Sequence, residues 1–370
     1  MLRATMNKMI FSNLAYRPLR SIISIFAVAI EVTLILLIVG FALGTLNDQR
    51  ARTKGVGADI MVRPPGSSIF AALSAAPMPI KIGDLVARQQ HVVAVAPVVV
   101  QTSSKLEVLS GIDLQAFETL GGPMRYLEGG PFQGPDDMIV DEYYAASNKV
   151  GVGDKVTALE HKFRVAGIVS QGRGSRAYVP ITTLQAMTGA EGKATVFYVK
   201  LDDPRNSDAV AREINALPGM ENYNIKTMEE WLSLMSANNI PMLSRFIDIV
   251  IWISVVIGFL VIFQSMYTAV MERTREIGIL KSLGASKLYI VRVILRETLM
   301  LAFAGILVGM LISYLAAYAI RYKLPTAQVE FTPAWLLKAA IIAVIGAMVG
   351  ALYPAFKAAQ KDPIDALAYE

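Results

Sequence analysis

The chain has 370 residues, of which 54% are hydrophobic and 18% charged, and its mean hydropathy is +0.47. This composition is too apolar for an ordinary soluble protein and too polar for one wholly buried in lipid. It therefore predicts a membrane protein that also carries a folded soluble domain. The net charge of +5 does not indicate nucleic-acid binding, because the Lys and Arg residues concentrate beside apolar runs. Cysteine is absent, which excludes disulfides and thiolate chemistry.

Residues 1–18 predict an amphipathic helix that lies on the cytoplasmic membrane surface ahead of Pro18. Apolar and basic side chains recur there at helical spacing on opposite faces. The apolar face contains Leu2, Met6, Met9, Ile10 and Leu14, and the basic face contains Arg3, Lys8 and Arg17.

Four apolar runs are long enough for helices that cross the hydrocarbon core, which takes about 20 residues. They span residues 19–46, 247–270, 293–320 and 336–354. The first run could instead be a secretory signal, but its apolar core exceeds the roughly 7 to 15 residues of such signals, which favours a membrane anchor. The third run predicts a helix that starts near Ser286 and ends near Ile320, which is longer than the hydrocarbon core is thick.

Basic residues flank these runs unevenly, and an excess of Lys and Arg marks cytoplasmic segments. We therefore expect both termini in the cytoplasm. The expected order is a periplasmic domain at residues 47–243, a cytoplasmic loop at 271–292, a periplasmic loop at 321–335 and a cytoplasmic tail at 355–370. Arg50, Arg52 and Lys54 disagree with this rule, but long translocated domains tolerate such charges.

The segment at residues 47–243 predicts an α+β domain, in two subdomains, inserted between the first and second spans. Expected strands are 58–62, 92–100, 105–109, 138–140, 155–159, 163–169, 178–179 and 195–201, with a loop at 64–79 and helices at 143–148 and 208–217. Thr227 and Glu230 have the spacing of a helix-capping box, which predicts a helical stalk before Pro241.

Three sequence patterns carry a family resemblance. The most specific is the stretch from Met271 to Ser286, which reads MERTREIGILKSLGAS. The others are GVGDKV at 151–156 followed by FRVAGI at 163–168, and YPA at 353–355 followed by DPIDAL at 362–367. Together they resemble the MacB/FtsX-like permeases of ABC transporters, a family that includes LolC, LolE and the DevC exporters.

The resemblance implies two permease copies, identical or paralogous, that meet a dimer of cytoplasmic ABC ATPases through a coupling helix. The ATPase-coupling residues carried over are Glu272, Arg273, Arg275, Glu276, Ile277, Gly278, Leu280, Lys281 and Gly284. The pattern supports this independently, since Ile277, Leu280 and Leu283 fall near one helical face while Arg273, Glu276 and Lys281 lie elsewhere. The alternative is a basic loop whose charges only set the topology.

The chain contains no phosphate-binding loop of the Gly-x-x-x-x-Gly-Lys-[Ser/Thr] type. We therefore expect ATP and magnesium on a separate ATPase chain, and no cofactor, metal or catalytic residue on this one. His91 and His161 stand alone, and neither a His-Glu-x-x-His motif nor a Ser-centred nucleophile elbow occurs. The pattern therefore disfavours an enzyme.

Glu31 is the only charged residue in the first span, so it should face the protein interior, where an ionised side chain needs a partner or water. It could act in gating or in a dimer contact, or it could be one satisfied or protonated carboxyl. Glycines repeat every four residues in the third and fourth spans and predict close helix packing, within one subunit or at a dimer seam. These glycines are Gly305, Gly309, Gly346 and Gly350.

Two functions remain open. The resemblance implies a mechanotransmission exporter of the cell inner membrane, in which ATP binding drives motion of the periplasmic domain. Its cargo would be a lipoprotein, lipid or glycolipid, peptide or drug, passed to a periplasmic adaptor and an outer-membrane channel. Alternatively, the chain regulates an external cell-wall hydrolase, as FtsX does, although FtsX domains are usually much smaller. Membrane lipid is an expected partner in both cases, and nucleic acid is not.

Overall fold

The computed structural model describes residues 18–67, 76–102 and 108–361 of the chain. It divides into two compact units. Within the described residues, the first unit contains residues 18–44, 242–322 and 329–361, and the second contains residues 45–241 and 323–328 with the gaps named above. The amphipathic helix expected before Pro18 and the pattern expected at 362–367 lie outside the described residues.

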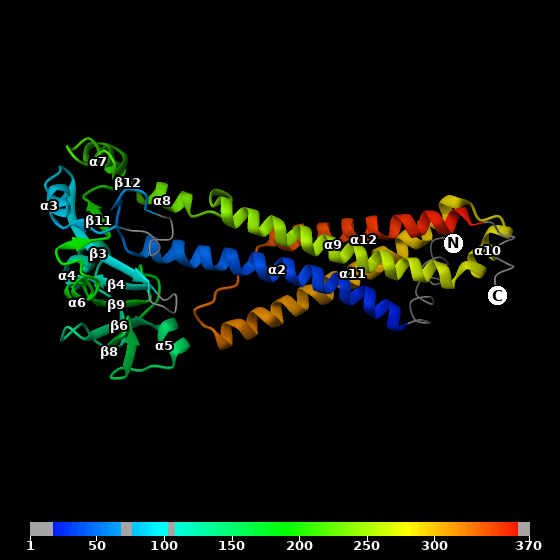
Figure 1. Cartoon of the computed structure of the whole chain (residues 1–370), viewed down its shortest axis with the longest axis horizontal. Coiled ribbons are helices and arrows are strands. Elements are labelled where there is room, and N and C mark those ends of the chain that lie inside the picture. The colour runs from blue at the N-terminus through cyan, green and yellow to red at the C-terminus, as the bar shows by residue number, and fades with distance from the viewer. Residues whose placement is uncertain (1–17, 68–75, 103–107, 362–370) are drawn as a thin grey trace. The chain divides into compact units, whose positions relative to one another are not determined.

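The first unit is a bundle of four helices, α2, α9, α11 and α12, that run side by side (Figure 1). All four are long and apolar enough to cross a membrane, which confirms the predicted membrane fold. Their bounds are Pro18–Gly55, Pro241–Glu272, Lys287–Lys323 and Pro333–Gln360. Three of them begin at proline, whose missing N–H costs nothing in the first helical turn. At 37 residues, α11 is about 55 Å long and therefore exceeds the hydrocarbon core, as expected.

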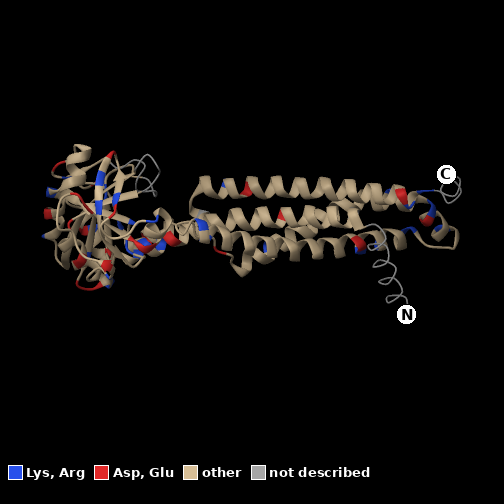
Figure 2. Cartoon of the chain, turned by 90° about the horizontal axis from the view of Figure 1, so that it is seen from below, with Lys and Arg blue, Asp and Glu red and all other residues tan. Residues whose placement is uncertain are grey.

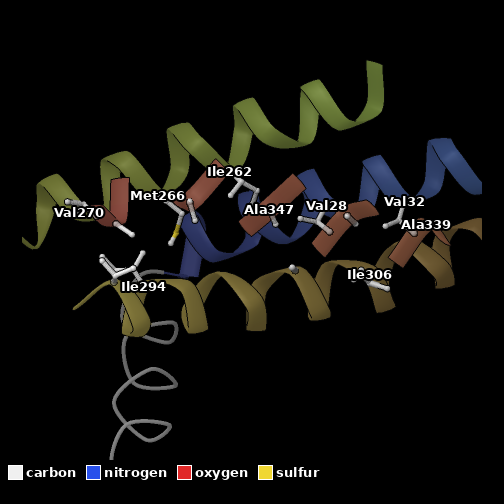
Figure 3. Packing of buried hydrophobic residues seen from close by; sticks show 14 of the residues in the cluster. Val28, Val32, Ile262, Met266, Val270, Ile294, Ile306, Ala339 and Ala347 are labelled. Atoms are coloured by element: carbon white, nitrogen blue, oxygen red, sulfur yellow. The ribbon is translucent and has the colours of Figure 1, made fainter. Parts of the chain in front are cut away.

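The core of the bundle combines branched apolar side chains with a row of alanines. Val28 and Val32 of α2, Ile262 and Met266 of α9 and Ile306 of α11 are all buried there (Figure 3). On α12 the buried positions recur every four residues and are Ala339, Ala343, Ala347, Ala351 and Ala355. Because alanine projects little beyond the backbone, α12 can approach its neighbours closely.

The outer faces of the same helices carry large apolar side chains. Charged residues are sparse along these helices (Figure 2). Trp252 is 70% exposed, Phe303 62% and Leu311 60%. A surface of this kind is stable only in contact with lipid, so the chain is a multi-pass membrane protein.

The second unit is an α+β domain built on one ten-stranded sheet. The strand order is β12 (Asn224–Thr227), β1 (Ile60–Arg63), β11 (Val196–Leu201), β3 (Val92–Thr102), β4 (Val108–Ile112), β9 (Ala177–Pro180), β6 (Asp137–Asp141), β8 (His161–Val169) and β5 (Tyr126–Gly129), with β7 (Lys155–Ala158) paired to β8. A separate pair joins β2 (Met78–Pro79) to β10 (Lys193–Ala194). The sheet is mixed, since β9 runs parallel to β4 and β6 runs parallel to β8.

Short helices cover this sheet and divide its apolar residues into two cores. They are α3 (Lys81–Ala87), α4 (Leu114–Gly121), α5 (Glu142–Asn148), α6 (Ile181–Thr188), α7 (Ser207–Asn215) and α8 (Met228–Leu234), with 3-10 turns η1 (Pro204–Asn206) and η2 (Ala237–Asn239). The two expected subdomains thus correspond to two cores along one continuous sheet. They are not separately folded bodies, because β3 pairs with both β11 and β4.

Most of the predicted strands are present, with shifted ends. The strand expected at 105–109 overlaps β4 at Val108 and Leu109, its first three positions lying outside the described residues, and the last two positions of the loop expected at 64–79 form β2. The predicted cap is also confirmed, because the Thr227 side chain accepts a hydrogen bond from the Glu230 N–H at the start of α8. The prediction missed β2, β5, β10, β12, α3, α4 and α6.

Candidate functional site

The segment with the most specific motif forms a short helix, α10, from Thr274 to Ser282. It follows α9 after a break at Arg273, whose backbone (φ −106°, ψ 16°) is not helical. Past its end, Gly284 adopts φ +94°, a left-handed conformation that glycine reaches without steric cost. Thr274, Ile277 and Gly278 are buried, at the i, i+3 and i+4 spacing of one helical face. α10 is therefore amphipathic and packs on the bundle through this face.

Arg273 is fixed at the start of α10 by an ion pair with Glu297 of α11. Its Nη1 atom lies 3.1 Å from Glu297 Oε2, and the two side chains are only 12% and 4% exposed. Removing either partner would break an ion pair that is largely shielded from water, which is destabilising. We expected Arg273 to be available to a partner, but its guanidinium is used within the chain.

Lys281, in the last turn of α10, is held in a comparable way. Its Nζ donates to the backbone carbonyl of Ala359 at 3.1 Å and also to that of Lys361. These carbonyls terminate α12, where no further turn can satisfy them and where a cation is favoured. α10 is thus attached to α11 at its beginning and to α12 near its end.

The opposite side of α10 is exposed, and we call it the docking face. It consists of Arg275, Glu276, Ile279 and Leu283. Leu283 is 80% exposed and Ile279 is 44% exposed. The prediction that Leu283 shares a face with Ile277 is therefore wrong, because α10 ends at Ser282 and Leu283 turns outward. Sequence reasoning also left out Ile279, although it lies one turn before Leu283.

A cavity of about 320 Å³ lies beside α10, between the end of α9 and the start of α11. Its walls are mainly apolar and include Val270, Ile277, Leu280 and Ile294, with the Arg273 and Glu297 pair at one side. Leu280 is half-buried. The cavity leaves space for small movements of α10 against the bundle.

The remaining motif residues divide between the two faces. Glu272, the last residue of α9, is exposed, and Gly284 is exposed beyond the end of α10. Of the residues carried over as coupling residues, the described structure thus presents Glu272, Arg275, Glu276 and Gly284 to solvent. It uses Arg273, Ile277, Gly278 and Lys281 for anchoring.

Three of the four predicted packing glycines lie at close contacts inside one chain, and Gly346 lies at an ordinary van der Waals distance from its neighbour. A Cβ on Gly305 would stand 2.6 Å from Val28 Cβ of α2, and one on Gly309 would stand 2.7 Å from the Ala29 carbonyl oxygen. A Cβ on Gly350 would stand 2.9 Å from the Phe259 carbonyl oxygen of α9. A Cβ on Gly346 would stand 3.6 Å from Glu31 Oε1. The glycines thus allow α11 to pack on α2 and α12 to pack on α9.

Glu31 faces the interior of the bundle, as expected, and is 1% exposed. Two turns earlier on α2, the Ser24 and Ser265 hydroxyls hydrogen-bond at 2.5 Å, which places α2 beside α9. A Cβ on Gly258 of α9 would stand only 2.0 Å from Glu31 Oε2, so the carboxyl group fills the space that this glycine leaves.

A second charged cluster lies in the α+β domain, around Arg176 at the start of β9. Its guanidinium reaches Asp48 Oδ2 at 2.9 Å, Asp141 Oδ2 at 3.1 Å and the Thr326 carbonyl oxygen at 3.3 Å. Arg52 joins the cluster, since its Nε lies 3.0 Å from Asp48 Oδ2. The cluster therefore connects the end of α2, the sheet and the loop between α11 and α12.

The members of this cluster are well shielded from solvent. Asp141 is 2% exposed and also caps α5, accepting the Tyr144 N–H at 2.6 Å. Burial raises the pKa of Asp141, and the positive charge of Arg176 and the Tyr144 hydrogen bond oppose that rise only in part. Sequence reasoning noted Arg52 only as a charge against the topology rule, and it missed Arg176, whose partners are far away along the chain.

Comparisons with known proteins show the family of this chain. The model for the MacB-like periplasmic core domain matches residues 21–217, more than half of the chain, and the model for the FtsX-like permease C-terminal region matches residues 249–363. An uncharacterized ABC transporter permease of Methanocaldococcus jannaschii is 28% identical over 233 residues, which cover 59% of this chain and 58% of that protein.

The macrolide export ATP-binding/permease protein MacB of Escherichia coli K12 is 26% identical over 230 residues, which cover 59% of this chain and 35% of MacB. The match thus spans little more than half of one relative and about a third of the other. Among solved structures, the periplasmic region of MacB from Actinobacillus actinomycetemcomitans matches with a TM-score of 0.38 and 20% identity, over 48% of this chain and 92% of that one. From the family models, the chain belongs to the ABC transporter permeases that combine a MacB-like periplasmic core domain with an FtsX-like permease C-terminal region.

Proposed function

We propose that this permease couples ATP hydrolysis by a separate cytoplasmic ABC ATPase to motion of its periplasmic α+β domain. The motion would export or extract an amphipathic substrate such as a lipoprotein, a lipid, a peptide or a drug. The observation that carries the proposal is the docking face of α10, where apolar and charged side chains stand exposed on a helix that is anchored at both ends. In the proposed topology, α10 and both termini are cytoplasmic.

The chemistry of the docking face fits a protein partner better than lipid or water. Leu283 and Ile279 offer apolar anchors, and Arg275 and Glu276 beside them can form charge-assisted hydrogen bonds at the rim of an interface. A loop that only set the topology would need basic residues but no exposed apolar pair. In the proposed assembly, two permease copies meet two ATPase chains, which bind the ATP and magnesium, and an adaptor and an outer-membrane channel receive the substrate.

The test is purification of tagged protein from native membranes in mild detergent, with mass spectrometry of its companions and an ATPase assay. We expect an ABC ATPase to accompany the wild type and to be lost from Leu283→Glu and from the double charge reversal Arg275→Glu, Glu276→Arg. A loss of at least tenfold in recovered ATPase is expected, because Leu283→Glu would place a charge where the proposed interface buries an apolar side chain. Arg273 is unsuitable for this test, since its reversal would break the pair with Glu297.

The matched control is Arg205→Glu, which changes a side chain that is 89% exposed in the α+β domain. It should retain the ATPase, while the docking-face variants should keep the thermal stability of the wild type. A docking-face variant that binds as much ATPase as the wild type would contradict the proposal. Recovery of a cell-wall hydrolase with the ATPase would instead support a regulator of that hydrolase.

A further inference from the structure

Glu31 is a titratable group in the middle of the membrane bundle that the proposed coupling does not use. Both of its carboxyl oxygens are buried, and neither has a hydrogen-bond partner among the described residues. The side chain is 1% exposed. A buried polar group without a partner is rare in proteins, because its desolvation is not compensated.

The surroundings of Glu31 form a fitted space for a carboxyl group. On one side Gly258 of α9 leaves room that any larger residue would fill, since its Cβ would stand 2.0 Å from Glu31 Oε2 and 2.7 Å from Glu31 Cδ. On another side Gly346 of α12 lies beside Glu31 Oε1. Glycine at both positions means that two helices accommodate this one side chain, so its burial depends on how α2, α9 and α12 pack together.

Among the described residues, no positive group hydrogen-bonds to Glu31 to compensate a negative charge there. None of the side chains that the structure describes hydrogen-bonds to the Glu31 carboxyl group. Along the sequence, the titratable residues that flank Glu31, Gly258 and Gly346 are Arg20 and Asp48 on α2, Asp248 and Tyr267 on α9, and Lys338 and Tyr353 on α12, while α11 carries Arg296, Glu297 and Tyr314. An ionised carboxylate in such a place is costly, whereas a protonated one is neutral.

The only cation that such a site can hold is one that needs a single ligand. The described residues contain no group of three His, Cys, Asp or Glu side chains that could bind a metal ion. A metal ion would also require several oxygen ligands, and the described residues place no hydrogen-bonding group at the two carboxyl oxygens of Glu31. A proton needs only one of those oxygens.

We propose that Glu31 is a proton-binding site within the bundle, occupied while α9 and α12 pack against α2 and emptied when these helices separate and water reaches the carboxyl. The site does not depend on the ATPase or on the substrate. It makes the packing of the bundle sensitive to pH, since the packed state binds a proton that the separated state releases. Raising the pH therefore favours the separated state.

The first test is infrared spectroscopy of the full chain in lipid nanodiscs, as the difference between the wild type and Glu31→Gln. We expect the carbonyl band of a protonated carboxylic acid in the wild type, shifted in D₂O and absent from the variant. Glu128→Gln is the matched control, because Glu128 is exposed and its removal should leave the band unchanged. A second measurement needs no variant: dicyclohexylcarbodiimide, which reacts with protonated carboxyl groups in apolar surroundings, should modify the peptide that contains Glu31.

The second test follows the thermal unfolding midpoint as the pH is raised through the neutral range. The wild type should lose stability relative to Glu31→Gln, because only the wild type loses a bound proton on separation of the helices. The absence of both the infrared band and the carbodiimide adduct at every pH would overturn the proposal. So would a band that persists at every pH together with equal unfolding midpoints for the two proteins.

Discussion

Replacing Arg176 with alanine should lower the free energy of unfolding of the α+β domain by about 3–5 kcal/mol, because it removes the cation from a buried cluster. Asp141, which is 2% exposed, would lose its ion-pair partner. Asp48 would keep Arg52, so the loss is concentrated at Asp141 and at the Thr326 carbonyl. Thermal and denaturant unfolding of the full chain in detergent, followed by fluorescence, measures the change.

The matched control for this variant is Arg164→Ala. Arg164 also pairs with a buried aspartate, Asp137, but it is 50% exposed. Asp137 additionally accepts the N–H groups of Gln133 and Gly134 at 2.6 and 2.9 Å, and these bonds remain in the variant. We expect a loss of about 1 kcal/mol or less. Equal losses for Arg164→Ala and Arg176→Ala would show that the cluster around Arg176 stabilises the domain no more than a half-exposed ion pair does.

Replacing Gly305 with alanine should destabilise the membrane bundle by more than about 2 kcal/mol, because the new methyl group has no space. Its carbon would stand 2.6 Å from Val28 Cβ and 2.8 Å from the Ile25 carbonyl oxygen, and backbone atoms cannot move aside as a flexible side chain can. α11 would have to move away from α2 and lose packing along its length. The midpoint of thermal unfolding in detergent should fall accordingly.

Gly346→Ala is the control, since it makes the same change in a neighbouring membrane helix. Its Cβ would meet Glu31 Oε1 at 3.6 Å, which is an ordinary van der Waals contact. This variant should keep an unfolding midpoint close to that of the wild type. A Gly305→Ala protein as stable as Gly346→Ala would mean that α2 and α11 do not pack as closely as described.

Local and one-dimensional signals in the sequence predicted much of the fold. The length of an apolar run predicts a membrane helix, and the three-residue spacing between Thr227 and Glu230 predicted the helix cap at Thr227. Alternating branched residues indicated β3 and β8. The helices α3, α4 and α6 were missed because each has only seven or eight residues, which is too short for a clear helical period.

The candidate sites were predicted less completely, because their geometry depends on contacts between distant residues. The family motif located α10, but the motif gives no indication of which residues anchor it. Arg273 was recognised, but nothing in the sequence connected it with its partner Glu297, 24 residues further on. Arg176 and Thr326 are 150 residues apart, and no local pattern relates them.

The attachment of α10 at two points determines how a load on its docking face is distributed. A helix joined only at its junction with α9 would swing about that junction, and the load would stop there. With Arg273 held by α11 and Lys281 held by the end of α12, the same load divides among three membrane helices at once. If the proposed partner binds there, α10 would pass the load to all three helices, and breaking either attachment would remove one helix from that path.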